Sequence, residues 1–404
     1  MDLDVGDSAA EFRTSMRQWI AENAPSGLTE IADWSAAAIG VADHDALDRA
    51  RALPAYAEWE RRLAAASLIC PHWPTAVGGR GWDAVQSTTF AAECYRAGVP
   101  KIERGMGESL VGPAIIAHGT AEQKARLLPR IISAEDVYCQ GFSEPDHGSD
   151  LAGLATRGVI DGDEVVITGQ KIWTSGADRA TMIFVLCRTD PDAPRHRGLS
   201  YVLAPMHDNN IEMHEIRHIG GRVMFHGEFL DGARAPLGNV IGGLGNGWRV
   251  AMTTLGHERG GRAATQYLMA EREFWELAEL ARERGRADDA LIRDQLAQAY
   301  MGVHLMRCNG MRTLVALAEG REPGPQASVA KLFWSEHHQR VGELALAIEG
   351  RAAVLRPPGA GYVTDRWQDV FLTGRANTIF SGTSEIQRNI IAQRALGLPG
   401  RSTS

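Results

Sequence analysis

The chain has 404 residues, of which 44% are hydrophobic and 23% are charged, and its formal net charge is −8. This length allows two or three domains with a large core, and the composition is ordinary for a globular protein. The acidic balance disfavours non-specific nucleic-acid binding, and no stretch approaches the roughly 18 apolar residues of a membrane-spanning helix.

The cysteines and the N-terminus indicate the cellular compartment. The five cysteines, at positions 70, 94, 139, 187 and 308, are widely spaced and include no C-x-x-C pair. This spacing favours a reducing compartment over a disulfide framework or a zinc ribbon. The segment Met1–Asp7 is acidic and lacks the basic and apolar regions of a signal peptide. We therefore expect a cytoplasmic protein with no membrane association.

Residues 1–136 are predicted to form a helical domain. Phe12, Met16, Trp19 and Ile20 recur at helical spacing, and Pro25-Ser26-Gly27 ends that helix. A second helix is predicted from Ala55 to Ser67. Asp83 is a plausible N-cap for a third helix, and Thr120-Ala121-Glu122-Gln123 has capping-box spacing for a fourth.

Residues 137–238 change to short β-type segments. Runs of β-branched and apolar residues at 165–167, 182–187, 199–203 and 211–213 are separated by Gly, Asp, Asn and Pro. Strands this close together, with no helix between them, predict an antiparallel sheet or small barrel instead of βαβ units.

Residues 239–404 return to a helical pattern after the glycine-rich segment Gly242–Gly247, which we interpret as a linker. The predicted helices run from Trp248 to Glu283, from Asp288-Asp289 to about Glu319, from Ala327 to Leu355 and from Ser384 to Leu396.

Two segments of the middle region suit a planar ligand. The loop Ser143–Asp150 is rich in hydroxyls, acids and glycine, and such loops present backbone N–H groups to polar ligands. The segment Gly169–Gly176 places the indole of Trp173 beside the hydroxyls of Thr174 and Ser175. From the residues alone, two surface turns that flank a hairpin, with Trp173 in the core, explain the pattern equally well.

Three other patterns suggest chemistry that their context disfavours. His214-Glu215-Ile216-Arg217-His218 matches the zinc-protease pattern H-E-x-x-H, which requires a helix, whereas this segment is predicted to be a strand. The glycines at 242–247 form neither a dinucleotide-binding nor a Walker A sequence. Ser143 and Ser149 lack the nucleophile-elbow context of a serine hydrolase.

A third segment, Ile379–Ile391, together with the two ligand-binding candidates above, resembles the acyl-CoA dehydrogenase family. The resemblance covers almost the whole chain, and the three motifs occur in the family's order. It implies an α+β fold with an N-terminal helical domain (1–136), a middle antiparallel β-barrel or sandwich (137–238) and a C-terminal four-helix-type bundle (239–404).

The resemblance also implies a catalytic base. Family members remove the α-proton of an acyl-CoA thioester with a glutamate while the flavin N5 accepts the β-hydrogen as hydride. Many members carry this glutamate at the position of Ser381, where serine without a partner base cannot take the proton. Another branch places the base in the first C-terminal helix before an arginine, which maps the role onto Glu258, followed by Arg259. The alternative is an ordinary surface pair of Glu258 with Arg262 at i, i+4.

The remaining site residues are carried over by position. The backbone N–H of Ser381 corresponds to the donor that stabilises the enolate oxygen, while Ser149, Arg259 and Gly382 correspond to substrate-binding positions. Glu385 is acidic where some relatives carry glutamine. The positions implied to contact FAD are Phe142, Ser143, Ser149, Trp173, Thr174, Ser175, Thr383 and Glu385.

One expected motif is missing, and several alternatives stay open. Many relatives bind the flavin diphosphate through an Arg-x-x-Phe-Gly motif of a neighbouring subunit, but residues 281–289 contain no Phe-Gly. Arg282, Arg284 or Arg286 is the candidate substitute. The resemblance predicts an acyl-CoA dehydrogenase that passes electrons to an electron-transfer flavoprotein, as a homodimer, homotetramer or mixed-subunit assembly, with a bulky or branched acyl substrate. The alternatives are a flavin oxidase or monooxygenase, a non-catalytic subunit of a mixed assembly, and a zinc hydrolase.

Overall fold

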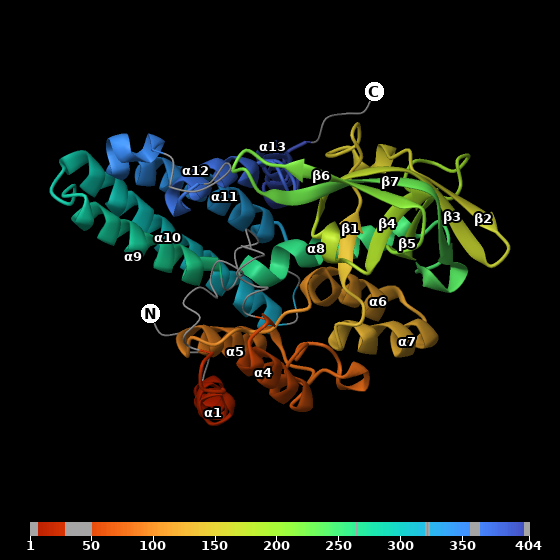
Figure 1. Ribbon diagram of the computed structural model, residues 1–404, viewed down its shortest axis with the longest axis horizontal. Helices are drawn as coiled ribbons and strands as arrows, with labels where there is room; N and C mark the ends of the chain where they lie inside the picture. Colours follow the sequence, from red (N-terminus) through yellow and green to blue (C-terminus); the bar gives the residue numbers. More distant parts are fainter. Residues whose placement is uncertain are drawn as a thin grey trace. The chain divides into compact units, whose positions relative to one another are not determined.

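The computed structural model describes residues 7–28, 51–263, 266–319, 321, 324–355 and 364–399, and the side chains of 7–9, 257–263 and 318 lie outside this description (Figure 1). The chain forms two compact units. The first contains residues 1–72, 81–102 and 259–404, and the second contains residues 73–80 and 103–258. These units do not test the three domain limits expected from the sequence, which stay a prediction.

The N-terminal helices of the first unit confirm the sequence pattern. They are α1 (Asp7–Asn23), α4 (Pro54–Ala65) and α5 (Ala84–Arg96). Asp83 caps α5: its side chain accepts the N–H of Gln86, whose own side chain accepts the N–H of Asp83. Such a reciprocal cap satisfies two donors that a helix start otherwise leaves unpaired.

The C-terminal part of the first unit is also helical. They are α9 (Gln266–Glu283), α10 (Ala290–Ala318), α11 (Gln326–Glu349), α12 (Arg366–Asn377) and α13 (Ser384–Ile390). Figure 1 shows α9, α10 and α11 lying alongside one another. Their apolar faces form one core that includes Leu277, Val303, Leu344 and Trp367.

Two points about these helices go beyond the sequence pattern. The predicted helix from Trp248 to Glu283 corresponds to α8 (Gly247–Ala263) and α9; residues 264–265 lie outside the described residues, so its continuity stays a prediction. Helix α12 was not predicted. Its N-cap is Asp365, which forms the same reciprocal capping box with Gln368 that Asp83 forms with Gln86. The signal for the start of α12 is therefore present in the sequence.

The second unit combines helices with a β-sheet. Its helices are α6 (Gly112–His118), α7 (Ala121–Ile132) and α8 as far as Glu258. Thr120 forms the predicted capping box with Gln123. The strands are β1 (Tyr138–Gly141), β2 (Arg157–Asp161), β3 (Glu164–Ser175), β4 (Met182–Arg188), β5 (Leu199–Pro205), β6 (Ile211–Arg217), β7 (Val223–Pro236) and β8 (Val240–Ile241). Short 3-10 or π turns of this unit occupy Thr75–Val77, Gly107–Val111, Leu151–Gly153, Ala177–Arg179 and Leu237–Asn239, and those of the first unit occupy Gly350–Val354 and Ile391–Ala395.

The sheet is mixed, whereas the sequence predicted antiparallel pairing. The strand order is β6-β7-β3-β2-β4-β5-β8, with β1 beside β4. Most neighbours are antiparallel, but β1 and β4 pair in parallel, as do β2 and β4 at Arg157 and Arg188. A parallel pair needs a crossover connection. Here the β2–β3 hairpin lies between β1 and β4 in sequence and takes the place of the helix that a βαβ unit would use.

The zinc-protease pattern lies on a strand, as predicted. Its first histidine, His214, is in β6, where alternate side chains point to opposite faces. Within the described ranges, no group of three or more His, Cys, Asp or Glu side chains is arranged to hold a metal ion. None of the described helices is long and apolar enough to cross a membrane.

Candidate functional site

Trp173 occupies a bulge near the C-terminal end of β3. The register between β3 and β7 shifts between Ile172 and Thr174, and Trp173 has φ +66°. A bulge of this kind redirects one side chain, and such bulges are common next to active sites. The indole is 57% exposed and meets the ring of Phe225 edge-on, at 6.0 Å between centroids. This exposure excludes the alternative in which Trp173 is a core residue.

A buried ion pair between Lys171 and Glu144 stabilises β3 next to the bulge. Lys171 is completely buried, and its Nζ donates to Glu144 Oε1 at 2.9 Å, to the Phe142 carbonyl at 3.1 Å and to the Leu186 carbonyl at 2.9 Å. Burial lowers the pKa of Lys171, and the Glu144 carboxylate opposes this shift.

The same pair ties the predicted polar loop to the strand. Burial acts to raise the pKa of Glu144, but Lys171 and the N–H groups of Thr156 and Ala155 outweigh it and lower that pKa to about 2. The N–H of Ile172 also donates to the Ser143 carbonyl at 3.0 Å. The loop that begins at Ser143 therefore has a fixed position relative to the bulge.

The predicted contact residues of this unit differ in accessibility. Phe142 is a core residue, because its ring packs edge-on against Phe184 at 5.5 Å and Tyr201 at 5.9 Å. Ligand contacts from Phe142 therefore have to come from its backbone. Thr174 is buried as well, whereas Ser143 and Ser175 are half-buried and Ser149 is exposed. The Thr174 hydroxyl lies 2.5 Å from Glu228 Oε2, so its hydrogen-bond partner is a buried side chain.

The second group of predicted residues surrounds the turn between α12 and α13, in the other unit. Ser381 and Gly382 are consecutive left-handed residues, with φ +53° and +89°. Thr383 caps α13 by accepting the N–H of Ile386 at 3.2 Å. Glu385 is exposed, and its pKa is lowered by a backbone N–H and by the hydroxyl of Thr383.

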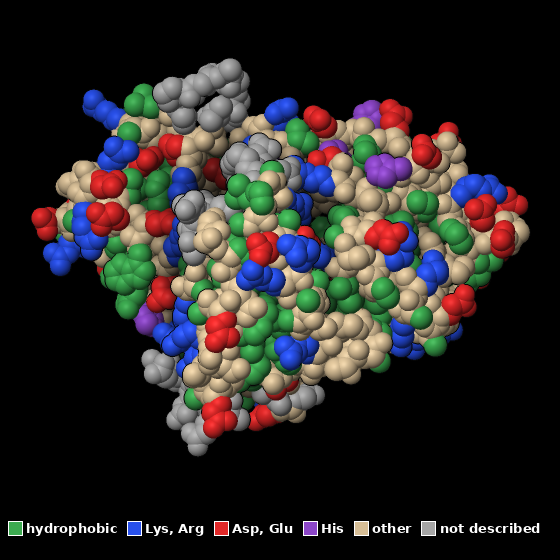
Figure 2. All heavy atoms as spheres, turned by 60° about the horizontal axis from the view of Figure 1, so that its bottom comes forward, with side chains coloured by type: hydrophobic (Ala, Val, Ile, Leu, Met, Phe, Trp, Pro, Cys, Tyr) green, Lys and Arg blue, Asp and Glu red, His purple; other side chains and the backbone are tan. Residues whose placement is uncertain are grey.

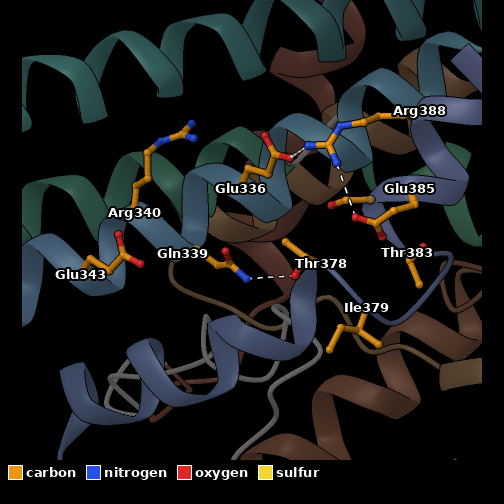
Figure 3. Close-up of a pocket in the computed structure, with 10 residues that line it drawn as sticks. Glu336, Gln339, Arg340, Glu343, Thr378, Ile379, Thr383, Glu385 and Arg388 are labelled. Atoms are coloured by element: carbon orange, nitrogen blue, oxygen red, sulfur yellow. Dashed lines mark hydrogen bonds and ion pairs between the residues drawn. The ribbon is translucent and has the colours of Figure 1, made fainter. Parts of the chain in front are cut away.

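A cleft of about 490 Å³ opens beside this turn (Figure 3). Arg388 forms an ion pair with Glu336 and lies 3.6 Å from Glu385, while the described residues provide no ion pair for Arg340. A cationic side chain free to pair is suited to an anionic ligand. The cleft is lined by Glu336, Gln339, Arg340, Glu343, Thr378, Ile379, Thr383, Ser384, Glu385 and Arg388.

Glu258, the proposed catalytic base, and the Arg259 that follows it lie on α8. Its backbone is helical through Glu258 and Arg259, but both side chains lie outside the described residues. The alternative pairing of Glu258 with Arg262 is outside them as well. The catalytic role of Glu258 therefore stays a prediction.

Several buried polar residues at these two locations were not assigned a role from the sequence. They are Glu144, Lys171 and Glu228 in the second unit, and Lys331 and Gln387 in the first. A signal for Lys331 does exist. It lies four residues from both Ala327 and Ser335, which are buried, so helical spacing puts it on the inner face of α11.

Comparison with known proteins identifies relatives along the whole chain. Family models match the N-terminal domain of acyl-CoA dehydrogenases at residues 7–135, the middle domain at 139–230 and the C-terminal domain at 245–396. The chain is 42% identical over 393 residues to acyl-CoA dehydrogenase IpdE1 of Mycobacterium tuberculosis, covering 96% of this chain and 97% of that one. It is 40% identical to the IpdE1 of Mycolicibacterium smegmatis, with the same coverage.

Solved structures share the fold. A structure titled Tcur3481-Tcur3483 steroid ACAD has a TM-score of 0.79 and 31% identity, covering 99% of this chain and 100% of that chain. A structure of the ChsE4-ChsE5 complex from Mycobacterium tuberculosis has a TM-score of 0.76 and 27% identity, with the same coverage.

Proposed function

The chain belongs to the acyl-CoA dehydrogenase family of flavin-dependent oxidoreductases, and on that premise we propose that it oxidises an acyl-CoA to its α,β-unsaturated thioester with FAD as the flavin. The bulge at Trp173 carries this proposal. An exposed indole, fixed on a strand by a buried ion pair, offers the flat apolar surface that an isoalloxazine ring needs. The half-buried Ser175 beside it supplies a hydroxyl.

In the proposed reaction, Glu258 removes the α-proton of the thioester. The backbone N–H of Ser381 donates to the thioester oxygen, where negative charge develops as the C–H bond breaks. Because an α-proton of a thioester is a very weak acid, a preorganised donor at this oxygen is essential for the rate. When bound, the flavin supplies the acceptor for the β-hydrogen and its electron pair. The product gains the α,β double bond, and the proton stays on Glu258.

We assign further contacts by the chemistry of the side chains. Phe142 and Ser143, through their backbone, and Trp173, Thr174 and Ser175 form the wall that holds the flavin ring. Thr383 and Glu385 lie at the cleft beside α13, where Arg340 suits the FAD diphosphate better than the carboxylate of Glu385 does. Ser149, Arg259 and Gly382 are proposed to bind the substrate. The substitute for the missing arginine motif is one of Arg282, Arg284 and Arg286.

We propose that the acyl group is bulky and polycyclic or branched. A relative of known structure, 31% identical over nearly the whole chain, carries the description steroid ACAD. Small residues also follow the proposed base, at Gly260-Gly261 and Ala263-Ala264. A steroid-derived acyl-CoA is therefore the first substrate class to test.

The test is anaerobic bleaching of the flavin absorbance by a panel of straight-chain, branched and steroid-derived acyl-CoAs. We expect the steroid-derived thioesters to bleach fastest. Glu258→Gln should keep the flavin and lose bleaching by at least about 100-fold, within the range of general base catalysis. Glu271→Gln, the same change on the neighbouring helix α9, is the matched control and should bleach normally. Bleaching of Glu258→Gln at the wild-type rate would remove Glu258 from the mechanism.

The electron acceptor and the assembly are further proposals. We propose an electron-transfer flavoprotein as acceptor, so turnover should depend on it and not on oxygen; rapid reoxidation by oxygen would instead favour the oxidase alternative. We also propose a dimer or tetramer, with a second acyl-CoA dehydrogenase chain as a candidate partner, as in the structures titled as two-chain proteins.

The surface of α9 and α10 supports oligomerisation. Residues 295–311 of α10 contain a single Asp, Glu, Lys or Arg, although half of them are exposed. Figure 2 shows a small group of hydrophobic side chains beside charged ones in the left part of the view, on the side where Figure 1 draws α9 and α10. Exposed apolar faces of this kind mark protein interfaces. Light scattering of the chain, alone and co-expressed with a candidate partner, tests the proposal, and a monomer in both cases contradicts it. The exposed residues are Trp275, Leu291, Tyr300, Met301, Leu305 and Val315.

A further inference from the structure

The turn between α12 and α13 has a conformation that requires support. Ser381 and Gly382 both have left-handed backbones, which is uncommon for serine. Glycine suits φ +89° at position 382, and a Cβ there would lie 2.5 Å from Gln387 Nε2 and displace that amide. Strained backbone persists only where its surroundings hold it in place.

Lys331 of α11 holds one side of this turn. The side chain is buried, and its Nζ donates to the Gly382 carbonyl at 2.7 Å and to the Asn377 carbonyl, at the end of α12, at 3.0 Å. A buried ammonium is costly unless it is well hydrogen-bonded. The ammonium therefore links α11, the last residue of α12 and the turn.

Gln387 of α13 holds the other side. It is completely buried, and its Nε2 lies 3.1 Å from the Ser381 carbonyl and 3.3 Å from the Gly382 carbonyl. The N–H of Ser384 closes the turn by donating to the Thr378 carbonyl at 2.9 Å. The two carbonyls that follow the Ser381 N–H are thus both anchored by interior side chains.

We propose that Lys331 and Gln387 are positioning residues that fix the direction of the Ser381 N–H toward the thioester oxygen. This inference rests on the proposed function, in which that N–H stabilises the enolate. A donor lowers a barrier most when its orientation needs no adjustment during the reaction. Because the Ser381 and Gly382 carbonyls cannot rotate without breaking a hydrogen bond to Lys331 or Gln387, the backbone that follows the donor is held in one conformation, and this fixes the direction of the N–H.

The experiment uses the FAD-loaded full-length protein and the acyl-CoA that bleaches the wild type fastest. Lys331→Met removes both carbonyl contacts and keeps the length of the side chain, while Gln387→Met removes the amide. For each variant we would measure bound flavin, the acyl-CoA concentration at half-saturation, and the limiting bleaching rate per bound flavin. The isotope effect of an α-deuterated substrate shows whether proton removal limits that rate.

We expect Lys331→Met to lower the limiting rate per bound flavin by about 100-fold, as displacements of about 1 Å do, and Gln387→Met by about tenfold. Half-saturation should change by less than about threefold, which is under 1 kcal/mol of binding. Lys331→Arg, which keeps a buried cationic donor, should recover part of the rate. Thr313→Val, which removes the hydrogen bond of the buried Thr313 to the Asn309 carbonyl within α10, is the structural control and should keep the rate.

The outcomes separate this inference from the proposed function. If no acyl-CoA bleaches the wild-type flavin, the proposed function fails. If the wild type bleaches and Lys331→Met keeps its rate per bound flavin, even with less flavin bound, the two residues are merely structural and the inference is overturned. If Lys331→Met does not fold, Gln387→Met, which leaves the ammonium in place, decides by the same criterion.

Discussion

The carboxyl of Glu228, behind the Trp173 bulge, makes the second unit's stability depend on pH. Glu228 lies opposite Lys171 in the β3–β7 ladder and is completely buried. Burial raises its pKa to about 7 from 4.5, although the Thr174 hydroxyl and Lys171 oppose the shift. Cys139 on β1 also interacts electrostatically with Glu228, and the buried His226 lies two positions away on β7.

The contacts of Thr174 agree with a protonated Glu228. The Thr174 hydroxyl lies 2.5 Å from Glu228 Oε2 and 3.3 Å from the Gln140 carbonyl. A hydroxyl has one hydrogen and can donate to only one of these two acceptors. A protonated carboxyl that donates to the hydroxyl leaves the hydroxyl's hydrogen for Gln140.

The sign and size of the effect follow from the pKa. Because the folded state holds the Glu228 proton up to about pH 7 and the unfolded state releases it near pH 4.5, folding binds a proton in this window. The free energy of unfolding therefore falls as pH rises from 4.5 to 7. At about 1.4 kcal/mol per pH unit, the loss between about pH 5 and about pH 8 amounts to about 2–3 kcal/mol.

Glu228→Gln tests this by replacing the acid with a neutral amide. Urea unfolding of the wild type and the variant, from about pH 5 to about pH 8, gives the difference in unfolding free energy at each pH. Burial lowers the pKa of His337 to about 4, which gives an opposite slope, but this term is common to both proteins and cancels. We expect the variant to gain about 2–3 kcal/mol relative to the wild type across the range.

The control is Glu215→Gln, an exposed glutamate on the neighbouring strand β6, for which the difference should stay flat. A flat difference for Glu228→Gln, within about 0.5 kcal/mol, would show that the carboxyl is ionised in the folded protein and would refute the reasoning.

Three further changes test the same two regions. Lys171→Met should cost about 3–5 kcal/mol in urea unfolding, because it leaves the Glu144 carboxylate buried without its cation; Lys124→Met on α7 is the control, and an equal cost for both would contradict the buried pair. Gly382→Ala should destabilise the first unit by at least about 1–2 kcal/mol because of its left-handed backbone, and unchanged unfolding would mean that the turn relaxes easily. Trp173→Ala should weaken flavin binding about tenfold while Trp173→Phe keeps most of it, and equal flavin retention in both would exclude stacking on the indole.

The elements that the sequence predicted are those with strong local signals. Asp83 and Thr120 mark the starts of their helices in the sequence, because a capping box involves two residues only three positions apart. The runs at 182–187 and 199–203 are strands because continuous apolar segments are buried on both faces. In contrast, β7 was missed because Gly227 and Gly232 interrupt it and Glu228 lies at an interior position. Parallel pairing of β1 with β4 depends on contacts between segments distant in sequence, which no local pattern reveals.

The candidate site shows the same division between local and distant information. The motif around Trp173 was visible in the sequence, but the bulge that exposes the indole depends on a register shift against β7. The buried lysines were less visible, because a lysine among apolar residues has the same local pattern whether its ammonium reaches solvent or donates to interior carbonyls. Lys171 and Lys331 both donate to backbone carbonyls that are distant in sequence. A buried ammonium tolerates little displacement of its acceptors. These two lysines therefore constrain the backbone beside each group of predicted contact residues more tightly than the exposed side chains of those groups do.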